Sequence, residues 1–118
     1  MKLTKREFEN GIVVLEFSGN IRMGPECQRI SQEVDQLVGE GLNRVIFDFS
    51  EVDYLDSAGI GTLVSCLTKL KNSGGNLRLA GLKPMVAGVF KLTKIDTIIG
   101  LFPSVEEAAR DYPGASNG

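Results

Sequence analysis

The chain has 118 residues, of which 42% are hydrophobic and 24% are charged, and its formal net charge at neutral pH is −2. This length suits one domain with a real core and a single functional surface. The slightly acidic balance gives no general attraction to nucleic acid, so we expect no direct nucleic acid binding. Histidine is absent, which excludes Ser-His-Asp and Cys-His catalysis and most zinc sites.

The sequence shows no targeting signal and no paired cysteine motif. The amino-terminal segment MKLTKREFENG lacks the apolar core of a signal peptide, and no run approaches the roughly 18 apolar residues of a membrane span. We therefore expect a cytoplasmic protein without membrane insertion. Cys27 and Cys66 are far apart and show no CxxC spacing, which indicates buried, reduced thiols and neither a disulfide nor a metal pair.

The first half of the chain predicts a hairpin, a helix and a buried strand. Asn10-Gly11 suits the positive φ angles of a type I′ turn between two antiparallel strands. A helix over residues 25–39 follows from apolar residues at helical spacing. The short apolar run from Val45 to Phe49 is typical of a central strand that is buried on both faces.

The second half predicts alternating helices and strands. Residues 50–59 are expected to form a loop, and residues 58–72 a helix with apolar residues three and four positions apart. NLRLAG predicts a strand, Lys83-Pro84 begins a weaker helical pattern, and TIIGLF suggests a short edge strand. Ser104 with Glu107 forms a capping box for a last helix.

This order predicts one α/β domain over residues 1–112. Strand-helix-strand alternation requires parallel pairing, whereas the first hairpin is antiparallel. We therefore expect a mixed β-sheet of four to five strands with about four helices packed on it. Residues 113–118 are expected to form a flexible C-terminal tail.

The stretch FSEVDYLDSAGIGTLV, residues 49–64, is the candidate site, because binding sites in α/β sheets usually lie beyond the carboxyl ends of strands. It lacks the third glycine of a dinucleotide fingerprint and the GK[ST] of a P-loop. Ser57 suits the N-cap of the following helix. Alternatively, Asp56 caps the helix and leaves the Ser57 hydroxyl exposed in the first turn, and the residues alone leave both arrangements open.

The segment DFSEVDYLDSAGIGTL, residues 48–63, resembles the signature of STAS domains of the anti-sigma factor antagonist family. The hairpin, SGNI, GGNLRLAGL and PSVEEA also resemble the segments of this family, in the same order. The resemblance covers nearly the whole chain and implies a STAS-like mixed sheet.

The resemblance also implies a protein-binding module that is not an enzyme. In the bacterial antagonists, an anti-sigma factor that is also a serine kinase phosphorylates the serine of the D-S-x-G motif. This implies that Ser57 is the phosphorylation site and Asp56 its motif neighbour, while Ala58 stands where some members carry a second serine. Gly59 and Gly61 would keep the turn.

The implied switch regulates transcription. The unphosphorylated form would bind the anti-sigma factor serine kinase and release the sigma factor, and a metal-dependent serine phosphatase would restore that form. Phosphorylation adds a charge of about −1.5 to −2. Beside Asp53 and Asp56, this charge is expected to weaken partner binding on the order of 10- to 1,000-fold without a change of fold.

Further partner contacts are implied on both sides of this stretch. Met85, Val86 and Phe90 could form an exposed apolar surface on the third helix, although a core stripe is the commoner outcome at this spacing. Many family members carry an acidic residue after the second strand, and this chain departs from that pattern at Asn20 and Arg22. Arg22 could alter the choice of partner, stabilise a phosphoserine, or be an ordinary exposed arginine.

Two other hypotheses remain open at this point. The chain could be a stand-alone STAS subunit of a lipid-transport ABC complex or of a signalling scaffold. Alternatively, the acids of the candidate site could be catalytic carboxylates or Mg²⁺ ligands, although solvated acids are the simpler interpretation: Asp48, Glu51, Asp53 and Asp56. We expect no cofactor, and a monomer or weak dimer.

Overall fold

The computed structural model describes residues 1–112, so the predicted tail at 113–118 lies outside the described residues. Its five strands form one sheet in the order β1-β2-β3-β4-β5. The β1–β2 pair is antiparallel and the other pairs are parallel, which confirms the predicted mixed sheet. The strands are β1 (Lys2–Glu7), β2 (Val13–Ile21), β3 (Arg44–Leu55), β4 (Asn76–Ala80) and β5 (Gly100–Phe102).

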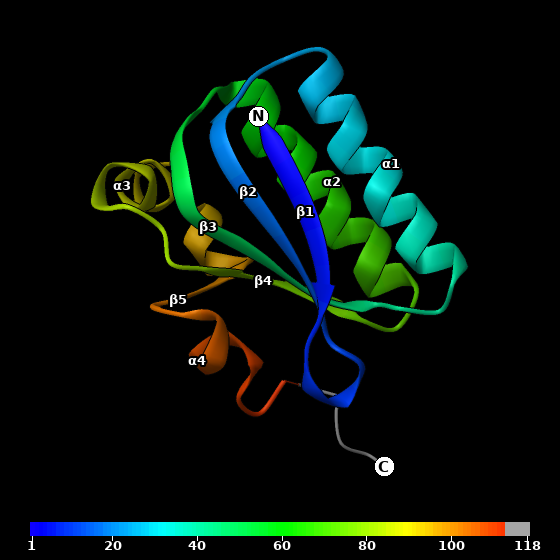
Figure 1. Cartoon of the computed structure of the whole chain (residues 1–118). Coiled ribbons are helices and arrows are strands. Elements are labelled where there is room, and N and C mark those ends of the chain that lie inside the picture. Colours follow the sequence, from blue (N-terminus) through cyan, green and yellow to red (C-terminus); the bar gives the residue numbers. More distant parts are fainter. Residues whose placement is uncertain (113–118) are drawn as a thin grey trace.

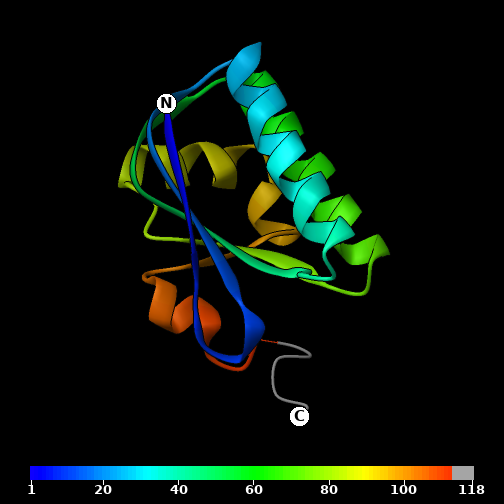
Figure 2. The ribbon, with the colours of Figure 1, turned by 45° about the vertical axis from the view of Figure 1, so that its right-hand side comes forward.

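Within residues 1–112, four α-helices pack around this sheet: α1 (Pro25–Gly39), α2 (Ser57–Asn72), α3 (Pro84–Leu92) and α4 (Val105–Ala109). Helices α1 and α2 lie side by side on one face, α3 lies beside the carboxyl end of β3, and α4 covers part of the opposite face (Figure 1). Figure 2 shows the same layers after rotation. No helix within residues 1–112 is both long and apolar enough to cross a membrane.

The first turn has the conformation that its sequence predicts. Asn10 and Gly11 both have positive φ, at 59° and 76°, and the Ile12 amide donates to the Glu9 carbonyl at 3.2 Å. These are the features of a type I′ turn, whose twist matches that of the flanking strands. The hairpin therefore places β1 against β2 in the predicted antiparallel arrangement.

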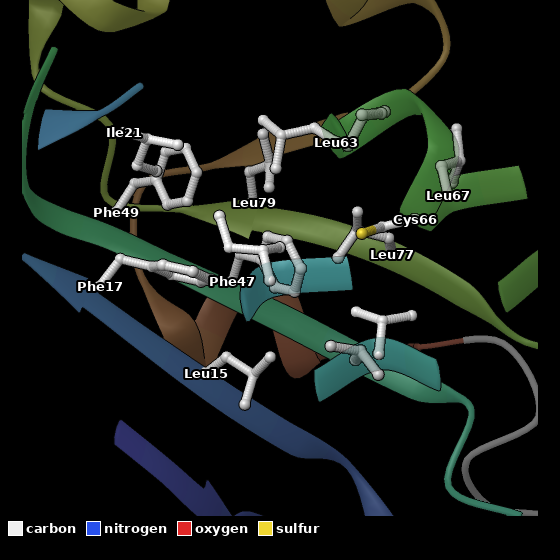
Figure 3. Packing of buried hydrophobic residues seen from close by; sticks show 14 of the residues in the cluster. Leu15, Phe17, Ile21, Phe47, Phe49, Leu63, Cys66, Leu67, Leu77 and Leu79 are labelled. Atoms are coloured by element: carbon white, nitrogen blue, oxygen red, sulfur yellow. The ribbon is translucent and has the colours of Figure 1, made fainter. Parts of the chain in front are cut away.

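Alternating apolar residues of the strands form the main core under α1 and α2. In Figure 3, side chains of α2 face those of β3 and β4 across this core. The ring centroid of Phe17 lies 4.8 Å from that of Phe47 and 5.3 Å from that of Phe49. Cys66 is buried here, whereas Cys27 is only half-buried, and both thiols are free.

A second apolar cluster lies on the opposite face, under α4. Ser104 caps this short helix, because its hydroxyl oxygen accepts the Glu107 amide at 3.2 Å. Beyond the helix, Tyr112 is buried at the amino end of β3. Its hydroxyl lies 2.9 Å from the Val45 carbonyl and 2.5 Å from the Asn76 carbonyl, and it accepts the Val45 amide at 3.0 Å. The last described residue therefore joins two strands.

Candidate functional site

The candidate site begins where β3 ends, and this strand is longer than predicted. It continues past Phe49 to Leu55, and Asp56 alone separates it from α2, which begins at Ser57. The prediction of a loop over residues 50–59 is therefore wrong. The acids in this segment stand on the last part of a central strand.

Two extra residues in β3 explain the wrong prediction. Glu16 of β2 lies opposite Asp48, but Ser18 lies opposite Glu51, so β3 carries one additional residue between them. A second shift places another extra residue at Asp53. Each such β-bulge reverses the face to which later side chains point. The period-two pattern is lost, and the acidic segment therefore reads as a loop.

Asp56 is the residue that organises the junction. It is the N-cap of α2, and its Oδ1 accepts the Gly59 amide at 2.8 Å. Its Oδ2 accepts the Met23 amide at 3.0 Å, which attaches the β2–α1 loop to the helix start. These backbone hydrogen bonds, that of Met23 first, lower the pKa of the Asp56 carboxyl. The interpretation of Ser57 as the cap is wrong, and the alternative cap Asp56 is confirmed.

Ser57 is the first residue of α2 and is exposed. Within residues 1–112 its hydroxyl forms no hydrogen bond, so it is available to other molecules. The amino end of a helix carries a partial positive charge that favours an anion nearby. The geometry therefore presents an accessible nucleophilic oxygen at a place where a phosphate is tolerated.

The two glycines of the motif have different surroundings. Gly59 is buried, and a Cβ added there would lie 3.2 Å from Ile21 Cγ2, the Ile21 carbonyl oxygen and Leu55 Cβ. Gly59 therefore lets α2 pack on the strand ends and is not placed to meet a partner, contrary to its prediction as a partner contact. Gly61 is exposed with nothing within 4 Å of such a Cβ, and Ala58 is half-buried. Gly61 leaves the helix surface accessible.

The β2–α1 loop lies next to this helix start, as the sequence suggests for Arg22. The Arg22 guanidinium carbon lies 5.8 Å from the centre of the Tyr54 ring, within the range of a cation–π contact. Both Met23 and Tyr54 are large apolar side chains with high exposure, at 75% and 50%. Neither residue is predicted as a contact from the sequence, although a Met or Tyr in a segment that is expected to be exposed is a usable signal.

Helix α3 forms the other wall of the site. Met85 is 79% exposed, whereas Val86 and Phe90 are buried in the main core. The prediction that Phe90 contacts a partner is therefore wrong, because the face of α3 that carries Val86 and Phe90 packs inward. A groove of about 200 Å³ lies between β3 and α3, lined by Asp53, Tyr54, Leu55, Met85, Val86 and Val89.

Asp53, which lines this groove, also forms an ion pair. Lys83 immediately precedes α3, and its Nζ lies 2.5 Å from Asp53 Oδ1. This hydrogen bond to Asp53 raises the pKa of the Lys83 ammonium. The pair joins the end of β3 to the start of α3. Asp53 is therefore held in an exposed ion pair at the end of β3.

The acids near the site are spread over different surroundings. Asp48 lies on the sheet face opposite α1 and α2, where its Oδ1 accepts the Ser50 amide at 3.0 Å. Asp53 binds Lys83, and Asp56 binds backbone amides. Across residues 1–112, no three His, Cys, Asp or Glu side chains form a group that could hold a metal ion. In this part of the chain, the carboxylates of Asp48, Asp53 and Asp56 therefore bind separate partners.

The chain is similar to known proteins over most of its length. A family model described as the STAS domain matches residues 4–108. BtrV of Bordetella bronchiseptica, provisionally named an anti-sigma factor antagonist, is 29% identical to this chain over 115 residues. The match covers 98% of this chain and 97% of BtrV.

Solved structures show the same fold. The crystal structure of a Thermotoga maritima protein, provisionally named an anti-sigma factor antagonist, gives a TM-score of 0.82 at 23% identity and covers 90% of each chain. The phosphorylated form of the Bacillus cell fate determinant SpoIIAA gives a TM-score of 0.71 at 18% identity. It covers 91% of this chain and 96% of SpoIIAA.

Proposed function

This chain belongs to the STAS domain family, and on that premise we propose that it is an anti-sigma factor antagonist switched by phosphorylation of Ser57. One observation carries the proposal: the exposed Ser57 hydroxyl stands at the first residue of α2, beside an aspartate that fixes the helix start. The full-length similarity to BtrV supports the same function. SpoIIAA, whose structure is similar, is known in both unphosphorylated and phosphorylated forms.

The fold is suited to carry a phosphate at Ser57. The hydroxyl is exposed, so a kinase can transfer the γ-phosphoryl group of ATP to its oxygen without unfolding the helix. The positive end of α2 offsets part of the added charge. The hydrogen bonds of Asp56 involve its own carboxylate and do not use the serine oxygen. Phosphorylation is therefore expected to leave the domain folded.

The same charge is expected to act strongly on a bound partner. The surface around Ser57 combines exposed apolar side chains with the carboxylates of Asp53 and Asp56. A phosphate adds about −1.5 to −2 charge to this surface. Like charges brought within a few ångströms at an interface cost on the order of one to several kcal/mol. This corresponds to a loss of affinity on the order of 10- to 1,000-fold.

In this scheme the protein is a ligand and a kinase substrate, not a catalyst. Its unphosphorylated form binds an anti-sigma factor with serine kinase activity, and the sigma factor is released. A metal-dependent serine phosphatase restores the binding form. Such a cycle operates in the cytoplasm. The residues proposed at the partner interface are Ser57, Asp53, Asp56, Ala58, Gly61, Arg22 and Met85.

The test is phosphorylation by a cognate anti-sigma factor kinase of the source organism. Purified protein, kinase and ATP are incubated, and the phosphorylated residue is identified by mass spectrometry. Ser57→Ala should abolish labelling. Ser65→Ala is the matched control, because Ser65 is also an exposed serine of α2, and this variant should be labelled normally. Labelling that persists in Ser57→Ala would contradict the proposal.

A further inference from the structure

Two cationic side chains flank the carboxyl end of β3, and they are held in different ways. Lys83 is engaged in the 2.5 Å ion pair with Asp53. The guanidinium of Arg22 lies over the Tyr54 ring at 5.8 Å, and in the described part of the chain it forms no ion pair with a carboxylate. Arg22 therefore presents a cation that is only weakly held.

The backbone of Arg22 is fixed even though its side chain is exposed. Its amide donates to Glu26 Oε1 at 2.8 Å, and its carbonyl accepts the Cys27 thiol at 3.3 Å. The next residue, Met23, donates its amide to Asp56, which directly precedes Ser57 in the chain. These three contacts hold the base of the arginine side chain beside the start of α2.

We propose that Arg22 binds the phosphate of phosphorylated Ser57, and that its guanidinium leaves the Tyr54 ring to do so. This inference rests on the proposed phosphorylation of Ser57. A cation–π contact at an exposed site is weak. Arginine can instead form two parallel hydrogen bonds with a phosphate, and such charge-assisted bonds are roughly twice as strong as neutral ones. The phosphate is the stronger ligand for this side chain.

The other charged groups around Ser57 favour this assignment. Asp53 and Asp56 repel a phosphate, and Lys83 is already paired with Asp53. Glu26 is anionic and accepts the Arg22 amide. Of the cations flanking the site in residues 1–112, Arg22 is the one without a carboxylate partner. Its position on the loop attached to Asp56 allows the long arginine side chain to turn toward the helix start.

The consequence is a switch with two effects on the partner surface. In the unphosphorylated protein, Arg22 is available to a carboxylate of the anti-sigma factor. Phosphorylation adds an anion at Ser57 and at the same time withdraws this cation from the partner. Tyr54 also loses the guanidinium that lies over its ring. The interface is therefore altered in charge and in shape without any change of secondary structure.

The experiment is a pH titration of the phosphate by ³¹P NMR, on full-length protein in which phosphoserine is introduced at position 57 during translation. The second pKa of phosphoserine is about 6, and a bound guanidinium lowers it. We expect the titration midpoint of the unsubstituted protein to lie about 0.5 pH unit below that of Arg22→Gln. Arg22→Lys, which keeps the charge but loses the paired hydrogen bonds, should fall between them.

Arg29→Gln is the matched control, because Arg29 is an exposed arginine of α1 that donates to the Leu3 carbonyl on the β1 side. Its midpoint should equal that of the unsubstituted protein. Equal midpoints for the unsubstituted protein and Arg22→Gln would overturn the proposal. The titration needs no kinase, so failure of the kinase to label Ser57 removes the proposed function but leaves this result unaffected.

Discussion

The two ends of β3 are built in opposite ways. At the amino end, the buried Tyr112 hydroxyl joins the backbones of β3 and β4, and Arg78 packs against the Tyr112 ring at 4.7 Å. At the carboxyl end, Asp56 joins the elements through two backbone amides, and large apolar side chains remain exposed around it. The domain therefore concentrates rigidity at one end and accessible surface at the other, which allows modification at Ser57 without loss of the fold.

The largest expected effect contrasts the tyrosines at these two ends. Tyr112→Phe removes the acceptor of the Val45 amide and the one proton that the hydroxyl can donate to the carbonyl of Val45 or of Asn76, and buried backbone groups without partners cost about 1–3 kcal/mol each. We expect the free energy of unfolding to fall by about 3 kcal/mol. Tyr54→Phe, at the exposed end, should change it by less than about 0.5 kcal/mol. Urea unfolding measures both, and similar values for the two variants would break the comparison.

The two glycines in the first turns of α2 are expected to respond to substitution in opposite ways, because Gly59 is buried and Gly61 is exposed. Gly59→Ala places a methyl group 3.2 Å from Ile21 and Leu55 atoms, so we expect a destabilisation of about 1–3 kcal/mol. Gly61→Ala meets no neighbour within 4 Å and should stabilise the helix by about 0.5–1 kcal/mol. Chemical unfolding provides both values. A stabilising Gly59→Ala would show that α2 does not pack tightly on the strand ends.

Substitutions of Asp56 distinguish helix capping from attachment of the loop. Asp56→Ala removes both roles, and we expect the melting temperature to fall by about 4 °C. Asp56→Ser retains a cap for the Gly59 amide but not a second oxygen for the Met23 amide. It should therefore recover most of the melting temperature, while amide hydrogen exchange at Met23 becomes faster. Unchanged exchange at Met23 in both variants would contradict the attachment.

Stability at alkaline pH tests the buried groups away from the site. Burial raises the pKa of the Cys66 thiol to about 12 and also raises the pKa of the Tyr112 hydroxyl. Above about pH 9 the unfolded chain loses the thiol proton that the native state retains, so the free energy of unfolding falls as the pH rises. The slope per group is at most about 1.4 kcal/mol per pH unit. Cys66→Ala should make the fall shallower between pH 9 and 10.

Much of the fold could be predicted because local signals and tertiary structure agree. Asn10-Gly11 specifies the first turn, and the spacing of apolar residues gives α1 with its observed bounds. The spacing of Val86 and Phe90 in α3 is typical of a core stripe, and both residues are buried. The prediction of Phe90 as a partner contact was wrong because the family resemblance indicated a partner surface on α3 but not which face of that helix forms it.

The remaining features depend on contacts that have no local signature. The two extra residues of β3 are apparent only when its pairing with β2 is known. The choice between Asp56 and Ser57 as cap depends on the Met23 amide, which comes from a distant segment. Tyr112 stands at the predicted boundary of a tail, and nothing nearby indicates that its hydroxyl reaches Val45. Each of these features joins residues at least 30 positions apart.

The most direct test of the central claim is the affinity of the anti-sigma factor for this protein with and without phosphate on Ser57. Isothermal titration calorimetry measures the dissociation constant, and thermal unfolding of the same samples reports on the fold. We predict that phosphorylation weakens binding on the order of 10- to 1,000-fold while the melting temperature stays within about 3 °C. Equal dissociation constants for the two forms, or a phosphorylated protein that no longer folds, would contradict the account.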